Sequence, residues 1–120
     1  MEAQAKFRNI KGSERKMRLV VDTIRGKEVV KAIGILKHTQ RNAAGPIYKT
    51  LLSAISNWEN KSGVESGADS FGLYVKTAFV DGAGMLKRFQ PAPHGRAHRI
   101  RKRSCHLTIV VDNKIPLEEN

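Results

Sequence analysis

Residues 71–80 read FGLYVKTAFV, and at this stretch the apolar pattern changes from the period of a helix to that of a strand. Phe71, Leu73, Val75 and Phe79 alternate with the other residues, as in a half-buried strand. Residues 107–111, LTIVV, repeat the alternation, and residues 3–10, AQAKFRNI, give a less regular third candidate. The sequence therefore predicts a small antiparallel sheet of three strands.

Upstream of this stretch, apolar residues recur three and four positions apart, which is typical of amphipathic helices. The first pattern covers residues 14–25, between a candidate N-cap at Ser13 and a glycine at Gly26, and the second covers residues 28–37. The third and strongest begins at Ala44, includes Trp58 on its apolar face and closes at Gly63. Three helices packed on one face of the small sheet predict an α+β fold with Trp58 in the core.

Residues 82–105 fit neither pattern, yet they join two good strands, so we expect one long hairpin that continues both. The turn is expected around Pro91–Arg96, because PAPHG at 91–95 cannot sustain a strand ladder. About ten residues per arm, at about 3.3 Å each, would extend about 30 Å. The chain is thus predicted to be a single domain, with a body at about 1–81 and 106–115, a protruding hairpin at about 82–105 and a disordered tail at 116–120.

The distribution of charge is more informative than its total. The 120 residues hold 22 Lys and Arg against 11 Asp and Glu, a net charge of +11. Residues 1–31 carry a net charge of +5 and residues 32–81 only +1, whereas residues 82–111 hold seven bases and no acid. A solvated face usually mixes charges of both signs, so the acid-free segment predicts binding to a polyanion, most commonly nucleic acid.

Several other classes of protein are excluded or disfavoured. No run approaches the roughly 18 apolar residues of a membrane span, and the start MEAQAK lacks the apolar stretch of a signal peptide. The single cysteine, Cys105, excludes an internal disulfide framework and suits a cytoplasmic location. His94, His98, Cys105 and His106 match no zinc spacing, and no nucleophile–base pair stands out. We therefore expect no metal, no cofactor, no small-molecule substrate, no membrane contact and no enzyme activity.

Two groups of cations are the candidate nucleic-acid contacts, because guanidinium and ammonium groups neutralise phosphates. The hairpin group comprises Lys87, Arg88, Arg96, Arg99, Arg101, Lys102 and Arg103. In an extended arm Arg99, Arg101 and Arg103 would share one face. The second group, near the first helix, comprises Lys6, Arg8, Lys11, Arg15, Lys16, Arg18, Arg25 and Lys27. Phe89, within the arm, is a candidate for base stacking. Tyr48 lies off the apolar face of its helix, and the sequence does not decide whether it stacks on bases.

Several alternatives remain at this point. The arm could serve only solubility. The helices at 14–25 and 28–37 could form a DNA-binding pair, although most unopposed charge lies elsewhere. His94, His98 or His106 could act in an RNA hydrolase. Acidic proteins and anionic membrane surfaces would also neutralise such a chain.

Several strings, taken together and in order, resemble the bacterial ribosomal large-subunit protein twenty-two family over roughly residues 5–112. They are KMR at 16–18 with VVDTIRGK at 20–27, LLSAISN at 51–57, LKR at 86–88, and GRAHRIRKR at 95–103 followed by SCHL at 104–107. Each string alone is weak, but their order and spacing together are specific.

The resemblance implies a structural constituent of the large ribosomal subunit, located in the cytoplasm, that binds 23S rRNA and supports subunit assembly. It implies a globular part near the exit of the polypeptide tunnel and a hairpin that passes through rRNA to line the tunnel. The implied partners are 23S rRNA, neighbouring large-subunit proteins and, at the hairpin tip, the nascent polypeptide. The tip residues are Gln90, Pro91, Ala92, Pro93, His94, Gly95 and Arg96.

Three departures from the family pattern accompany the resemblance. The family commonly has Glu-Gly-Pro where residues 82–84 read GAG, which removes an acid from the hairpin base. Glu14 stands where a small residue or proline is common. At the tip, PAPHG replaces a sequence with two further cations.

Overall fold

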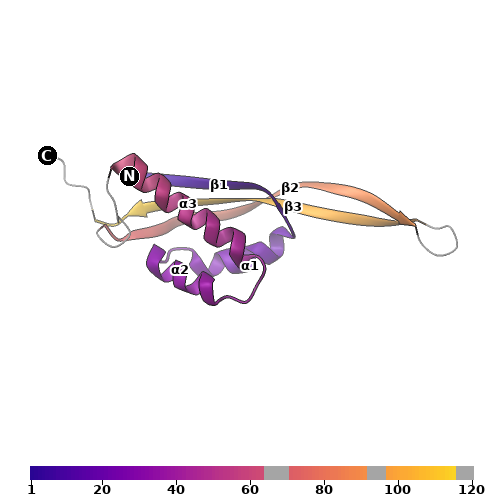
Figure 1. Ribbon diagram of the computed structural model, residues 1–120, viewed down its shortest axis with the longest axis horizontal. Coiled ribbons are helices and arrows are strands. Elements are labelled where there is room, and N and C mark those ends of the chain that lie inside the picture. The colour runs from indigo at the N-terminus through magenta and orange to yellow at the C-terminus, as the bar shows by residue number, and fades with distance from the viewer. Residues whose placement is uncertain (64–70, 92–96, 116–120) are drawn as a thin grey trace.

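The computed structural model describes residues 1–63, 71–91 and 97–115, and within β2 and β3 it describes side chains up to Gly82 and again from Ser104. In chain order the elements are β1 (Glu2–Lys11), α1 (Glu14–Ile24), α2 (Val29–His38), α3 (Ala44–Ser62), β2 (Leu73–Pro91) and β3 (Ala97–Asn113). Figure 1 shows three helices beside one long sheet, so the predicted α+β fold is confirmed.

The sheet is antiparallel and has the order β1-β3-β2, which places the last strand in the centre. β3 pairs with β1 from Glu2↔Asp112 to Lys11↔Ser104, and with β2 from Leu73↔Asn113 to Pro91↔Ala97. β1 stops near the point where β2 and β3 leave the body, so these two strands continue alone as a two-stranded ribbon (Figure 1). The predicted hairpin is thus present in the backbone of both arms, while its expected turn at 92–96 and the tail at 116–120 lie outside the described residues.

The core lies between the helices and one face of the sheet. On β3 the alternate residues Cys105, Leu107, Ile109 and Val111 are fully buried, as the period of a half-buried strand requires. Trp58 of α3 is also fully buried and donates its Nε1 hydrogen to the carbonyl oxygen of Met1 at 3.2 Å. The predicted core position of Trp58 is therefore confirmed.

The phase of the β2 alternation differs from the sequence prediction. A register shift between Val75 and Thr77 adds one residue to β2 opposite β3. Because a shift of one residue exchanges the two faces, Ala78 and Val80 are buried whereas Phe79 is 40% exposed. The prediction that Phe79 shares a face with Leu73 and Val75 was wrong for this reason.

A second irregularity explains why β1 looked less regular in the sequence. Its register shifts between Phe7 and Ile10, where Asn9 adopts a φ of 56°. The Asn9 amide donates to Nδ1 of His106 at 3.0 Å, which satisfies the group that the bulge removes from the ladder.

The helix ends agree with the sequence only in part. α3 closes at Gly63, whose φ of 74° is the left-handed conformation that glycine adopts most easily. Ser13 does occupy the N-cap position of α1, and its carbonyl accepts the Met17 amide at 3.2 Å. The Ser13 side chain, however, makes no capping hydrogen bond, so its predicted capping role is wrong.

Candidate nucleic-acid interface

Two of the cations near the first helix use their donors inside the protein. Nε and Nη2 of Arg18 donate to the carbonyl oxygen of Val80 at 3.2 and 2.8 Å, and Nη2 also pairs with Glu14 at 3.3 Å. Nε and Nη2 of Arg25 donate to the carbonyl oxygen of Ala78 at 3.1 and 2.8 Å. Each guanidinium therefore fastens α1 to β2 in the same way.

These contacts cover an edge of the sheet. β2 is an outer strand, and its free carbonyl groups would otherwise face solvent or another chain. The segment after α1 continues the cover: Gly26 donates its amide to Val75 at 3.0 Å, and Val75 donates its amide to Lys27 at 2.9 Å. Arg18 and Arg25 thus have a structural task, and their predicted phosphate contacts remain predictions.

The other six cations of the group are exposed and make no ion pair with any described acid. They are Lys6, Arg8, Lys11, Arg15, Lys16 and Lys27. Lys11 ends β1, and Arg15 and Lys16 lie in the first turn of α1 only a few residues later, so these three gather near the base of the hairpin. α1 has 11 residues, about 16 Å at 1.5 Å per residue, and Lys27 lies beyond its other end. The group is therefore not a single site.

A further set of cations was not predicted as a site. Residues 29–58 contain no acid and hold Lys31, Lys37, Arg41 and Lys49, all exposed and without a described ion pair. The net charge of residues 32–81 is only +1 because four acids follow this run and balance its charge, namely Glu59, Glu65, Asp69 and Asp81. An unbroken acid-free run was the signal that could have found it.

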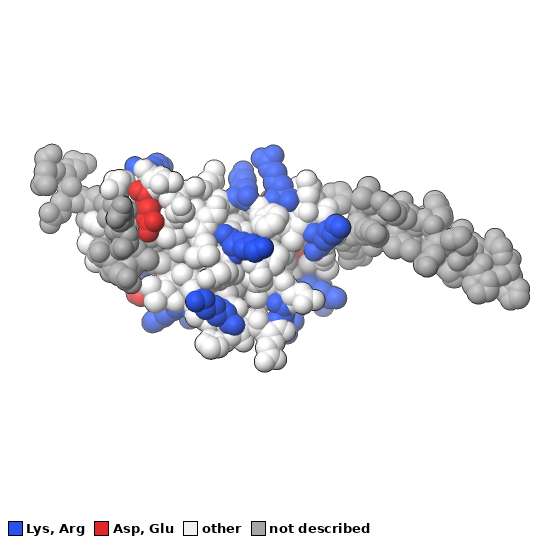
Figure 2. Space-filling view, viewed as in Figure 1, with Lys and Arg blue, Asp and Glu red and all other residues white. Residues whose placement is uncertain are grey.

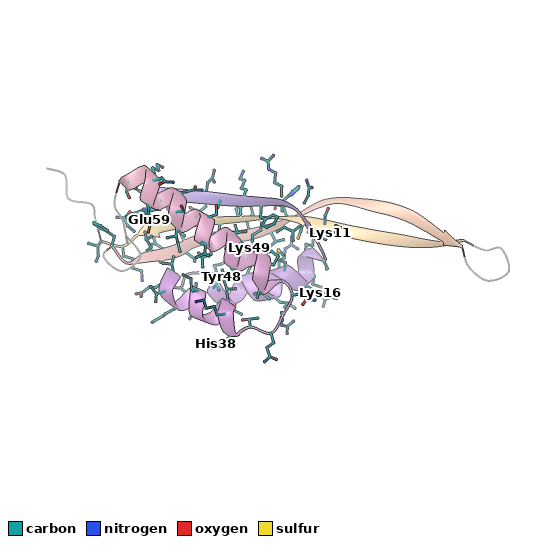
Figure 3. All side chains as sticks on the ribbon, viewed as in Figure 1. Lys11, Lys16, His38, Tyr48, Lys49 and Glu59 are labelled. Carbon is teal, nitrogen blue, oxygen red and sulfur yellow. The ribbon has the colours of Figure 1, made fainter. Side chains whose placement is uncertain are left out.

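The side of the body that carries α3 displays several of these cations together. In Figure 2 this side is marked by separate blue side chains, and the most prominent red side chain lies at the end remote from the hairpin. Figure 3 places Glu59 near that end, Lys49 farther along α3, and Lys11 and Lys16 beside the base of the hairpin. The α3 side thus becomes more positive toward the ribbon.

The aromatic candidates divide by burial. Tyr48 is half-buried, packs against the core and has the Lys37 ammonium 5.9 Å from its ring centre. Phe79 is exposed on the sheet face away from the helices. Phe89 belongs to the arm whose side chains are not described.

The hairpin cations can be placed only by register. Lys87 pairs with Arg101, Arg88 with Ile100, and Leu86 with Lys102, so basic positions recur on both arms. Their side chains, and the whole of the tip from Ala92 to Arg96, lie outside what the structure describes. The predicted phosphate and tunnel contacts of the hairpin therefore remain predictions.

Three further features of the described residues bear on metal binding, thiol chemistry and membrane insertion. No three His, Cys, Asp or Glu side chains gather among these residues as metal ligands. Cys105 is buried, and burial raises the pKa of its thiol, with Glu14 adding to the rise and Arg18 opposing it. A raised pKa disfavours the reactive thiolate. None of the described helices is both long and apolar enough to cross a membrane.

Comparison with known proteins gives one consistent result. The model of a family described as ribosomal protein L22p/L17e matches residues 5–112. The chain is 54% identical to the large ribosomal subunit protein uL22 of Bacteroides fragilis over 110 aligned residues. These residues make up 92% of this chain and 79% of the relative. The uL22 proteins of Flavobacterium johnsoniae and Porphyromonas gingivalis are each 53% identical, over 91% and 90% of this chain and 79% of each relative.

Proposed function

The chain belongs to the ribosomal protein L22p/L17e family and is a structural constituent of the large ribosomal subunit, and from this premise we propose that it binds 23S rRNA, supports subunit assembly and lines the polypeptide tunnel with its hairpin. Family membership makes it a structural protein and not an enzyme. Its relatives are bacterial, so its location is the large subunit in the cytoplasm.

The observation that carries the rRNA proposal is the composition of the ribbon. Residues 82–111 hold seven bases and no acid, and six of the bases belong to the two strands that pair from Gly82↔Cys105 to Pro91↔Ala97. The seventh, Arg96, lies outside the described residues. A two-stranded ribbon is at best marginally stable alone in water. Phosphates on both sides would supply the counter-charge and the surroundings that the ribbon lacks. We therefore assign Lys87, Arg88, Arg96, Arg99, Arg101, Lys102 and Arg103 to rRNA.

The body supports the same proposal with the exposed cations of β1 and α1. Lys6, Arg8, Lys11, Arg15, Lys16 and Lys27 have no described acid to neutralise them. Arg18 and Arg25 keep α1 on the sheet and thereby hold Arg15 and Lys16 in place. Neighbouring large-subunit proteins are the proposed partners of surfaces that rRNA leaves uncovered.

Charge reversal in the arm tests the rRNA proposal. The variant Arg99→Glu, Arg101→Glu, Arg103→Glu is expected to be lost from large subunits that are sedimented at high salt, because the reversed charges repel phosphates. A control variant with the same change in net charge, Lys61→Glu, Lys76→Glu, Lys114→Glu, alters exposed lysines outside the assigned set and outside the acid-free run at 29–58, and it is expected to remain bound. Equal retention of both variants would contradict the role of the arm.

A separate experiment tests the tunnel wall. A photo-crosslinking residue at Ala92 of ribosomes that carry a stalled nascent chain is expected to label the nascent polypeptide. Replacement of Pro91–Arg96 by a two-residue turn is expected to change nascent-chain contacts while leaving the protein in the subunit. Label on rRNA alone would remove the nascent polypeptide from the list of partners.

A further inference from the structure

A hollow of about 270 Å³ lies where the end of β1, the start of α1 and the start of α3 meet. Lys11, Ser13 and Lys16 line it from β1 and α1, and Asn42 and Pro46 line it from the start of α3. Figure 3 shows Lys11 and Lys16 on this side, beside the base of the ribbon. The volume is below the usual range of small-molecule pockets, and the lining combines cations with small polar groups.

The surroundings of the hollow extend its positive charge. Arg41 directly precedes Asn42, and Lys49 lies three residues after Pro46, which makes it a neighbour on the same face of α3. Both side chains are exposed. Of the four cations Lys11, Lys16, Arg41 and Lys49, none pairs with an acid in the described part of the chain.

The acid that could have neutralised this site is engaged elsewhere. Glu14 follows Ser13 directly, but its carboxylate pairs with Arg18 at 3.3 Å and lies against Gly82 of β2. No Asp or Glu is among the described residues that line the hollow. The side chains of Ser13 and Asn42 make no hydrogen bond with any described side chain or backbone group. The Ser13 hydroxyl and the Asn42 amide are therefore free beside Lys11 and Lys16.

Gathered like charges repel one another, and an anion that enters between them relieves the repulsion. A phosphodiester fits this chemistry, because it accepts hydrogen bonds from ammonium, hydroxyl and amide donors at once. The cations continue from the hollow along α3 toward Lys49, so successive phosphates of one strand would meet successive cations.

We propose that this hollow and the adjoining cations form a second rRNA backbone site, separate from the hairpin, in which Lys11, Lys16, Ser13 and Asn42 hold one phosphodiester and Arg41 and Lys49 contact the phosphates that follow it. The proposal rests on the proposed function, namely that the chain binds rRNA. It adds Ser13, Arg41, Asn42 and Lys49 to the interface and gives the body's contact with rRNA a defined site. The ribbon would then be held at its base by the body's contact with the same RNA.

The test compares two double variants of the full-length protein that remove the same charge. Lys16→Gln with Lys49→Gln removes one cation from the hollow and one from α3. Lys61→Gln with Lys114→Gln removes two exposed lysines outside the site and outside the acid-free run at 29–58. The affinity for a 23S rRNA transcript is measured by filter binding at several salt concentrations, and urea unfolding verifies that all three proteins are folded.

For the Lys16 and Lys49 variant we expect affinity to fall about tenfold or more, and the slope of log K against log salt to flatten by about 0.7 to 0.9 for each lost phosphate contact. The control pair is expected to keep the wild-type slope. Equal slopes for the two double variants would overturn the second site, while strong salt-dependent binding by the wild type would still support the proposed function. If the wild type bound the transcript without salt dependence, both proposals would fail.

A photo-crosslinking residue at position 49 in assembled large subunits identifies the class of partner. Label on 23S rRNA is the expected result. Label only on a neighbouring protein would overturn the phosphodiester assignment in favour of an acidic protein surface, and no label would show that this face is not at an interface.

Discussion

The carboxylate of Glu14 lies directly against the backbone of Gly82, so that a β-carbon added to Gly82 would be 2.7 Å from Oε2 of Glu14. This contact joins the first turn of α1 to the base of the ribbon. It also joins two of the positions at which the sequence differs from the pattern of the family that it resembles. In this chain the acid is on the helix and the small residue is on the strand.

The contact predicts that the effect of Gly82→Ala depends on residue 14. In the wild type the new methyl group displaces the Glu14 carboxylate and disturbs its pair with Arg18, so we expect stability to fall by about 0.5 to 1 kcal/mol. In a Glu14→Ala background the same change meets no carboxylate and reduces the freedom of the unfolded chain, so it is expected to be neutral or stabilising. Urea unfolding of the four proteins gives the coupling energy.

A charged replacement sharpens the same test. Gly82→Glu would place a second carboxylate beside Glu14, and we expect a larger loss of stability than for alanine. Glu14→Gln in the same chain should recover most of that loss. Additive effects of the changes at 14 and 82 would mean that the two residues do not interact.

Arg25→Ala is predicted to destabilise the fold, whereas Arg15→Ala is not. Arg25 holds the carbonyl of Ala78 on the sheet edge through two donors, and hydrogen bonds from charged groups contribute about 1.5 to 3 kcal/mol. Arg15 is exposed and has no described ion pair, so its loss should change stability by less than about 0.5 kcal/mol. Chemical denaturation measures both effects.

The same two variants separate structural from RNA-binding cations. The proposed function expects Arg15→Ala to weaken rRNA binding and to flatten its salt dependence by about one phosphate contact. Arg25→Ala should lower stability whatever its effect on RNA. A stable Arg25→Ala protein would show that the sheet edge does not need this guanidinium.

Much of the fold could be predicted from the sequence because the core residues repeat with simple periods. Ala44, Ile47, Leu51, Ala54 and Trp58 are all buried, as their helical spacing indicates. The bulge between Val75 and Thr77 could not be predicted, because it exists only in the register between β2 and β3. Its consequence, the exchange of faces at Phe79, was therefore missed as well.

The candidate site shows a different limit. Arg15 and Arg18 are equally basic in the sequence, and only the position of the β2 carbonyls distinguishes the free cation from the engaged one. Conversely, Arg41 and Lys49 stand in an acid-free run that the sequence does display. A net charge taken over residues 32–81 conceals them, because the four acids that follow the run in the sequence balance its charge.

The phase of β2 predicts unequal effects at neighbouring positions. Val80 is 3% exposed, and truncation to alanine removes two buried methyl groups, so we expect a loss of about 1.5 to 3 kcal/mol. Phe79 is 40% exposed on the other face, and Phe79→Ala should cost less than Val80→Ala despite its larger change in size. If urea unfolding showed a larger loss of stability for Phe79→Ala than for Val80→Ala, β2 would follow the regular alternation without a bulge.

Cys105 predicts how stability changes in alkali. Its Sγ lies 3.7 Å from Sδ of Met17 in the core, and burial, with Glu14 in support, raises the pKa of the thiol. In the unfolded chain the thiol ionises near pH 8.5, so above that pH the unfolded state binds fewer protons than the native state. The contribution of the raised thiol pKa to the free energy of unfolding is therefore complete below about pH 8.5. It is lost as the pH rises, by at most about 1.4 kcal/mol per pH unit. Cys105→Ala should show a shallower decline than the wild type between about pH 8.5 and 10, because the variant lacks this thiol. Parallel curves would mean that the native thiol ionises as freely as the unfolded one, and rapid alkylation of Cys105 in the native protein would lead to the same conclusion.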